Sequence, residues 1–188
     1  PTSPVATVLS LADKLDTLVG FFSLGLIPTG SQDPYALRRQ ANGVVQILVH
    51  GAYDLTVEEL LAAALAAYQE RQGLQRPAEP LLDDLREFLF QRLKYLLQEE
   101  QVRHDCIDAV FASTRHGLAG MAERARLLHG KLAREEMKET CEAFTRVKNL
   151  AAKATGAALN PHRLTEAAEK RLYETYQQTL AAWETVES

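Results

Sequence analysis

Hydrophobic residues recur at intervals of three and four along most of this 188-residue chain, which is the spacing of amphipathic helices. The pattern is strong over residues 5–22, where Leu11, Leu15 and Leu18 fall on one face. Two glycines, Gly25 and Gly30, and one proline, Pro28, follow within the next eight positions. The sequence therefore predicts a first helix that ends close to residue 22 and is followed by a loop.

Helix start signals predict two further helices. Asp33 is predicted to be the N-cap of a second helix, and Pro34 its first residue, a position where proline's missing N–H costs nothing. Thr56 and Glu59 stand three positions apart, as in a capping box, directly before another apolar run. Gly73 predicts where that helix ends.

The rest of the chain keeps the helical period and shows no convincing strand pattern. Residues 79–100 hold the period for about six turns. Asp105 is expected to cap a short helix, and Gly130 to separate a helix over 117–128 from a longer one over about 132–154. A last helix is expected to open at Asn160–Pro161. The sequence thus predicts an all-α fold of one or two helical bundles, with about seven to eight helices.

Composition allows a buried core and favours a reducing compartment. Hydrophobic residues make up 46% of the chain, and the two cysteines, Cys106 and Cys141, lack neighbours at metal-ligand spacing. No apolar run approaches the roughly 20 residues that cross a bilayer, and no basic signal-peptide start is present. Because the chain begins without Met, directly before a helical pattern, we expect it to be a piece of a longer cytoplasmic protein.

The charges are unevenly distributed along the chain. The net charge of -4 argues against nucleic acid when it is read alone. Residues 54–108 hold twelve acidic and six basic side chains, whereas residues 115–153 hold nine basic and five acidic ones. The second segment therefore carries a cationic surface, which is either a solvated helical face or a binding surface for phosphates.

The candidates for catalysis and metal binding are weak. Asp13 and Asp16 share a helix face, but a metal site needs further ligands, so we interpret them as polar surface residues. His104 and Asp105 stand at a helix start, where Asp is expected as a cap. No serine has a His and an acid near it in the sequence, and the loop near residue 30 lacks the Lys of a phosphate cradle. We expect no catalytic, metal or nucleotide site.

Cationic and amide side chains gather near the end of the long helix expected over about 132–154. Arg146 and Asn149 are three apart, and Asn149 and Lys153 four apart, so they are expected to share a face. Such a row holds phosphates by charge and reads unpaired bases through amide hydrogen bonds. The candidate RNA contacts are Arg146, Lys148, Asn149 and Lys153, extended by Arg124 and Arg126 on the preceding helix.

Several segments resemble one family along essentially the whole chain. The most specific runs cover residues 11–22, 25–31 and 33–41. The likeness is looser over 81–97 and 105–110. It returns in the run F-T-R-V-K-N-L at residues 144–150, which is similar to a K-R-V-x-N-I motif. On these residues the chain resembles the beta subunit of bacterial glycyl-tRNA synthetase.

The resemblance implies three parts. Residues 1–32 are the last helix of an HD-type domain and a loop, with Asp13 at the position of that domain's closing aspartate and without its upstream metal ligands. Residues 33–100 form a helical linker bundle. Residues 101–188 form a DALR-type anticodon-binding helical domain, related to that of arginyl-tRNA synthetase and truncated on its C-terminal side. Thr145 stands where the motif prefers Lys, which removes one charge.

The resemblance also implies a division of labour within glycine–tRNA ligase. The alpha subunit activates glycine with ATP and Mg²⁺, and the beta subunit grips glycine tRNA in a cytoplasmic holoenzyme of two alpha and two beta subunits. This chain is expected to belong to the grip, to hold no cofactor, and to contact neither DNA nor membrane. Arg38 and Arg39 match a family pattern and join the candidate tRNA contacts.

Two other interpretations stay open. The chain is alternatively a structural module that holds subunits or domains together, with RNA contacts made elsewhere. Its acidic first half and negative net charge favour that alternative. An HD-type hydrolase would need the metal ligands that are absent from this sequence.

Overall fold

The computed structural model describes residues 3–53, 55–71, 73–113, 117–132, 134–153 and 159–184. These residues form an all-α structure, as expected, and within them the extended backbone is limited to one isolated bridge between Thr29 and Gln32. The helices are α1 Pro4–Ser23, α2 Leu37–His50, α3 Val57–Arg71, α4 Ala78–Glu99, α5 His104–Ala112, α6 Leu118–Leu132, α7 Glu135–Ala151 and α8 Ala167–Glu184, with a 3₁₀ turn at Pro161–Arg163.

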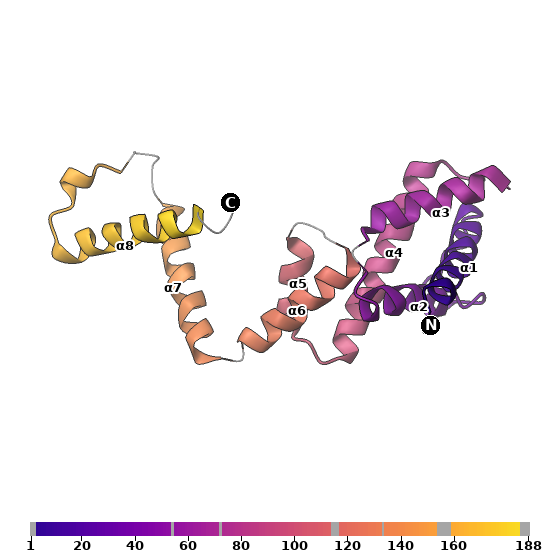
Figure 1. The fold of residues 1–188 in the computed structure, drawn as a ribbon, viewed down its shortest axis with the longest axis horizontal. Coiled ribbons are helices and arrows are strands. Elements are labelled where there is room, and N and C mark those ends of the chain that lie inside the picture. The colour runs from indigo at the N-terminus through magenta and orange to yellow at the C-terminus, as the bar shows by residue number, and fades with distance from the viewer. Residues whose placement is uncertain are drawn as a thin grey trace. The chain divides into compact units, whose positions relative to one another are not determined.

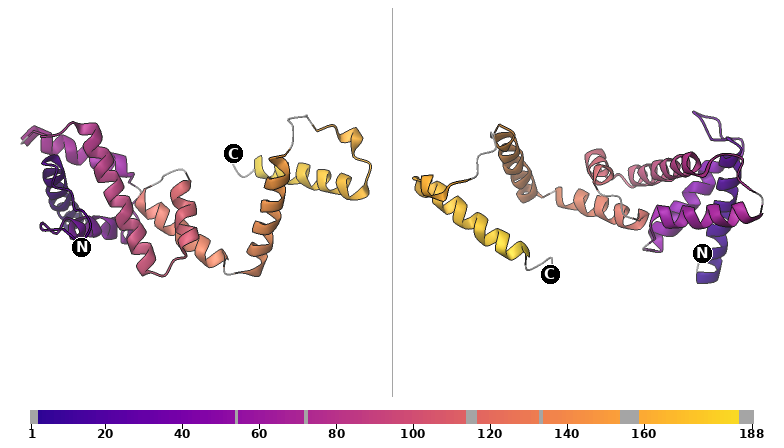
Figure 2. Two further views of the ribbon diagram at one scale, coloured as in Figure 1. Left: turned by 180° about the vertical axis from the view of Figure 1, so that it is seen from behind. Right: turned by 90° about the horizontal axis from the view of Figure 1, so that it is seen from above.

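The chain divides into two compact units, Pro1–Lys138 and Glu139–Ser188. In the first unit α1 packs against α2, α3 and α4, and α6 packs against α2, α4 and α5 (Figure 1). The two further views in Figure 2 show the same grouping of α1 to α4. The domain bounds expected at residues 32 and 100 come from the family resemblance and not from compactness, so they stay a prediction.

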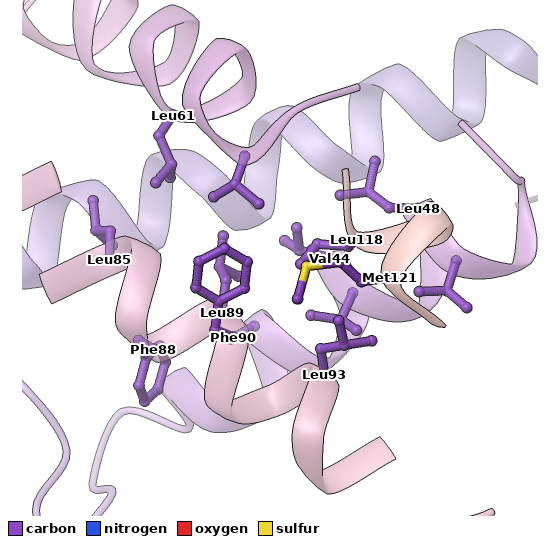
Figure 3. Close-up of a cluster of buried hydrophobic side chains, with 14 of the residues drawn as sticks. Val44, Leu48, Leu61, Leu85, Phe88, Leu89, Phe90, Leu93, Leu118 and Met121 are labelled. Carbon is purple, nitrogen blue, oxygen red and sulfur yellow. The ribbon is translucent and has the colours of Figure 1, made fainter. Parts of the chain in front are cut away.

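The core of the first unit lies where α2, α4 and α6 meet. Leu93 from α4, Val44 and Leu48 from α2, and Leu118 and Met121 from α6 belong to one cluster of buried side chains (Figure 3). All five side chains are 2% exposed or less. The 3.6-residue period of these helices puts such residues on one stripe, and burial of the stripes against one another supplies the main favourable term for folding.

Two helix starts follow the sequence closely. Thr56 and Glu59 form the predicted capping box, in which Thr56 N–H donates to Glu59 Oε2 at 3.0 Å and Glu59 N–H donates to Thr56 Oγ1 at 3.2 Å. Ser3 caps α1 by accepting from the N–H of Ala6, with Pro4 in the first turn. Residues 78–99 form the long fourth helix that the periodicity predicts.

The start of α2 lies later than predicted. Ala36 adopts a left-handed backbone, so the chain makes a turn after Pro34 and the helix begins at Leu37. Asp33 still serves the helix, because its carboxylate accepts from the N–H groups of Leu37 at 2.8 Å and Arg38 at 3.0 Å. The prediction of Pro34 as the first helical residue was therefore wrong, although the capping role of Asp33 is confirmed.

Three later boundaries also differ from the prediction. Gly130 lies inside α6, because a glycine with a helical backbone is tolerated at a modest cost. Asp105 lies in the first turn of α5 and not before it; its Oδ1 accepts from the N–H of Cys106 at 3.0 Å. Asn160 caps only the 3₁₀ turn, through the N–H of His162 at 3.1 Å. The last helix begins at Ala167. The carboxylate of Glu169, in its first turn, accepts from the N–H groups of Thr165 and Glu166, which precede the helix.

The second unit leaves much of its apolar surface open. Its described residues include no buried side chain, and Phe144 on α7 and Leu172 on α8 are 68% and 73% exposed. Val147, Leu150, Tyr176 and Leu180 are exposed as well. Within this unit α7 and α8 share little contact. Among the described helices of the whole chain, none combines the length and apolar character needed to cross a membrane.

Candidate nucleic-acid interface

One face of α7 presents the charged and amide groups singled out in the sequence. Arg146 and Asn149 lie three positions apart on the helix and both are exposed, with 80% of the Arg146 side chain open to solvent. Glu142 lies one turn before Arg146, at 3.8 Å between their charged atoms. An exposed pair at that distance is weak, so the Arg146 guanidinium remains available to an external phosphate.

Lys148 belongs to the other side of α7. Residues two positions apart on a helix are about 200° apart around its axis, so Lys148 cannot share the face of Arg146. It stands four positions after Phe144 and seven after Cys141, which places it on the exposed apolar stripe. The helix therefore separates two residues that the sequence pattern had grouped.

Lys153 follows the end of α7. The helix stops at Ala151, and the N–H of Lys153 donates to the carbonyl of Leu150 at 3.1 Å, three positions back. This is a tighter turn than the α-helix, so the expected four-residue relation between Asn149 and Lys153 does not follow from helical geometry. Lys153 is exposed and lies beyond the end of the helix.

Arg126, a candidate RNA contact, is engaged within the first unit. Its guanidinium donates two hydrogen bonds to the Glu100 carboxylate, both at 2.7 Å. The hydrogen bonds from Arg126 lower the pKa of Glu100, and the same contact raises the pKa of Arg126. A bidentate pair of this kind joins α6 to the end of α4 and leaves the Arg126 charge largely balanced.

Arg38 and its neighbour Arg39 have different surroundings. The Arg38 guanidinium donates to the carbonyls of Gly30 at 2.7 Å and Gln32 at 3.5 Å, so it holds the loop before α2. Arg39 is exposed and forms no ion pair with another residue that the structure describes. Arg124 on α6 is also exposed and likewise forms no ion pair with a residue that the structure describes. Arg39 and Arg124 are thus the accessible cations among the first-unit candidates.

Two of the three carboxylates that suggested chemistry in the sequence, Asp16 and Asp105, serve as ion-pair partners. Asp16 binds Arg71 at 2.5 Å, which ties α1 to the end of α3. Asp105 pairs with Arg103 at 2.6 Å, and His104 contacts Asp108 at 2.7 Å. Over the described ranges, no three His, Cys, Asp or Glu side chains gather as metal ligands.

Arg92 is a cation that the sequence reasoning missed. It lies on α4 with its guanidinium carbon 5.7 Å from the ring centre of Phe88 and 5.8 Å from that of Tyr95. Burial, with a contribution from nearby Arg38, lowers the pKa of Arg92. Its aromatic neighbours four before and three after it were visible in the sequence, and that spacing is a usable signal for a stacked arginine.

Comparison with known proteins decides the family. A family model described as the glycyl-tRNA synthetase beta subunit matches residues 1–112, which is more than half of the chain. The chain belongs to this family. It is 48% identical over 180 residues to the glycine–tRNA ligase beta subunit of Halalkalibacterium halodurans, an alignment that covers 95% of this chain and 26% of that protein.

Two further beta subunits show the same relation to this member of the family. That of Moorella thermoacetica is 43% identical over 182 residues, covering 95% of this chain and 26% of the relative. That of Bacillus subtilis is 40% identical over 177 residues, covering 94% of this chain and 24% of the relative. The chain therefore spans about a quarter of the length of the curated relatives that it matches.

Proposed function

We propose that this chain is a tRNA-contacting part of a glycine–tRNA ligase beta subunit, with its contact surface on α7. Membership of the beta-subunit family supports a role in aminoacylation of tRNA. The observation that carries the surface assignment is the exposed face of α7 that joins Arg146 to Asn149. A charged fork and an amide on one helical face are suited to a folded RNA with unpaired bases.

The two side chains have separate roles in this proposal. Arg146 donates to phosphate oxygens, where the planar guanidinium provides two parallel hydrogen bonds. Asn149 stands about one turn further along the helix, where its amide both donates to and accepts from the edge of an unpaired base. Such a combination suits the anticodon loop of glycine tRNA, and Arg39 and Arg124 are candidates for further phosphate contacts.

The chain acts in this proposal as one part of a larger enzyme. Glycine activation, with ATP and Mg²⁺, belongs to the alpha subunit, and the beta subunit holds the tRNA that receives glycine. We place this chain in a cytoplasmic holoenzyme of two alpha and two beta subunits. No residue of the chain is assigned a catalytic role.

A second candidate function is a structural module that packs against another part of the holoenzyme. The exposed apolar side chains of α7 and α8 favour it, because Phe144, Leu172 and Tyr176 lie open within a unit that has no described buried residue. Both functions are compatible on one helix, since Phe144 and Arg146 stand two positions apart and lie on different sides of α7.

A pair of charge reversals on α7 tests the proposed surface. Arg146→Glu and Lys148→Glu make the same change of charge on opposite sides of one helix. Binding of glycine tRNA to each variant is measured at low and moderate salt, with helicity followed by circular dichroism. We expect Arg146→Glu to weaken binding about tenfold and to reduce the salt dependence by about one phosphate contact.

Lys148→Glu serves as the matched control, and we expect it to weaken binding less than about threefold, through long-range charge alone. Equal losses in the two variants would contradict the assignment of the Arg146 face. Unchanged binding in both would favour the structural module.

A further inference from the structure

A polar cleft lies in the first unit between α1 and the end of α2. Its volume is about 460 Å³, which is the size range of small-molecule sites. α1 supplies three of its residues, and α2 with the turn that follows supplies the others. The residues that line it are Thr7, Ser10, Lys14, Gly43, Gln46, Ile47, His50, Gly51 and Tyr53.

The lining of this cleft, which we call the Lys14–His50 cleft, is rich in hydrogen-bond donors and contains no carboxylate. Ser10, Lys14, Gln46 and Tyr53 have side-chain donors that form no hydrogen bond with the described part of the chain. Thr7 differs, because its hydroxyl donates to the carbonyl of Ser3 at 3.0 Å. The cleft therefore combines a positive charge with several unengaged neutral donors.

Lys14 packs closely over Gly43. A Cβ atom added to Gly43 would lie 2.6 Å from Cε of Lys14 and 3.0 Å from its Cδ. The aliphatic part of Lys14 thus passes directly over the glycine, and any larger residue at position 43 would displace it. Lys14 forms no ion pair with a described residue, although Asp13 and Asp16 stand close to it on α1.

His50 closes the other side of the cleft. Its Nδ1 lies 2.9 Å from the carbonyl oxygen of Gln46, so this nitrogen donates to the backbone and leaves Nε2 unengaged. Glu100 is near enough for His50 to favour the charged form of its carboxylate, but both Glu100 oxygens accept hydrogen bonds from Arg126. The nearby acid is therefore already balanced by another cation.

We propose that the Lys14–His50 cleft binds a phosphate group. A phosphate brings two things that the cleft lacks, a negative charge beside Lys14 and several acceptor oxygens for the hydroxyl and amide donors. The volume leaves room for a sugar attached to that phosphate. The proposal concerns α1 and α2 and does not depend on the role proposed for α7.

Inorganic phosphate is the probe for the first experiment, with the 188-residue chain observed by amide NMR. We expect saturable shifts at the Gly43, Gln46 and Gly51 amides. Lys14→Gln should weaken binding about tenfold, because a charged hydrogen bond is lost while most of the side chain remains. Lys131→Gln makes the same charge change at an exposed site on α6 and should leave the affinity unchanged. Equal weakening by both variants would overturn the proposal.

Gly43→Ala provides a test that preserves charge. The new methyl group should displace Lys14 and weaken phosphate binding about fivefold or more, while alanine favours the helical backbone of α2. Unchanged affinity in Gly43→Ala would contradict the role given to Lys14.

A single-stranded RNA oligonucleotide with hydroxyl ends distinguishes the source of the phosphate. Shifts at the cleft that Lys14→Gln removes would identify a nucleic-acid backbone as the source. Shifts with inorganic phosphate alone would identify a free or terminal phosphate. Either result satisfies the proposal, and no shift with either probe would overturn it.

Discussion

The contact between Arg126 and Glu100 is the best-formed ion pair among the candidate RNA residues. Both hydrogen bonds are 2.7 Å long, and 40% of the Arg126 side chain and 31% of the Glu100 side chain stay exposed. Solvent screening therefore limits what the pair contributes to stability. We interpret Arg126 as a residue that fastens α6 to the end of α4, and not as a free phosphate ligand.

The pH dependence of this pair follows from the lowered pKa of Glu100. A carboxyl whose folded-state pKa lies below its unfolded value stabilises the fold above the unfolded pKa, about 4.3 for Glu. That stability is lost as the pH falls through the folded-state value. We expect Arg126→Gln to lower the free energy of unfolding by about 0.5–1 kcal/mol at neutral pH, with the difference vanishing in acid.

Urea unfolding of wild type and variant at neutral and acidic pH measures this difference. Arg124→Gln is the matched control, because Arg124 is exposed on the same helix. A loss in the control equal to that in Arg126→Gln, or a difference that persists in acid, would contradict the role given to the pair.

At the scale of the helix, Gly130 gives a direct test of the corrected boundary of α6. It lies near the C-terminal end of the helix, and a Cβ atom added there would meet nothing within 4 Å. We expect Gly130→Ala to raise the free energy of unfolding by about 0.5 kcal/mol, since alanine is the better helix former.

Gly25→Ala provides the opposite case for the same denaturation experiment. Gly25 also has open space around it, but its backbone is left-handed, with φ of 73°. We expect this change to destabilise the fold by about 1 kcal/mol. Destabilisation by Gly130→Ala would support a break in the helix at residue 130.

The hydrophobic periodicity of the sequence predicted the helices correctly, whereas the residues at which they begin and end were predicted less accurately. The runs that form α1, α3 and α4 carry long apolar stripes and, for Thr56 and Glu59, complete capping signals. Asp33 and Asn160 also gave correct capping signals, but the helix that Asp33 caps begins later than predicted, and Asn160 caps a short turn that precedes the last helix. A capping side chain reports where N–H groups need an acceptor, and this need is the same for a short turn and a long helix.

The sequence predicted the candidate site correctly only where the arrangement of residues depends on their spacing along a single helix. The relation between Arg146 and Asn149 follows from their spacing, and the same arithmetic separates Lys148 from them. The engagement of Arg126 by Glu100 and the passage of Lys14 over Gly43 depend on contacts between helices. Such contacts are set by packing of the whole unit, which local spacing does not determine.

At the scale of the whole molecule, the two units differ in how they are stabilised. Leu93 is fully buried between α2, α4 and α6, whereas Leu172 on α8 is 73% exposed. We expect Leu93→Ala to lower the free energy of unfolding of the first unit by about 2–5 kcal/mol, through lost burial and a cavity. Leu172→Ala should change stability by less than about 0.5 kcal/mol.

Thermal or urea denaturation of the two leucine variants tests this contrast. A large loss in Leu172→Ala would show that α8 is packed more extensively in solution than its exposure indicates. A negligible loss in Leu93→Ala would contradict the position of the core.

Direct binding of tRNA is the central claim, and titration of the 188-residue chain with glycine tRNA tests it most directly. A tRNA with another anticodon is titrated alongside, and both are measured at two salt concentrations. The account predicts tighter binding of the glycine tRNA, weakened by salt in proportion to the phosphates neutralised. No binding at low salt, or equal binding of the two tRNAs, would contradict anticodon recognition by this chain.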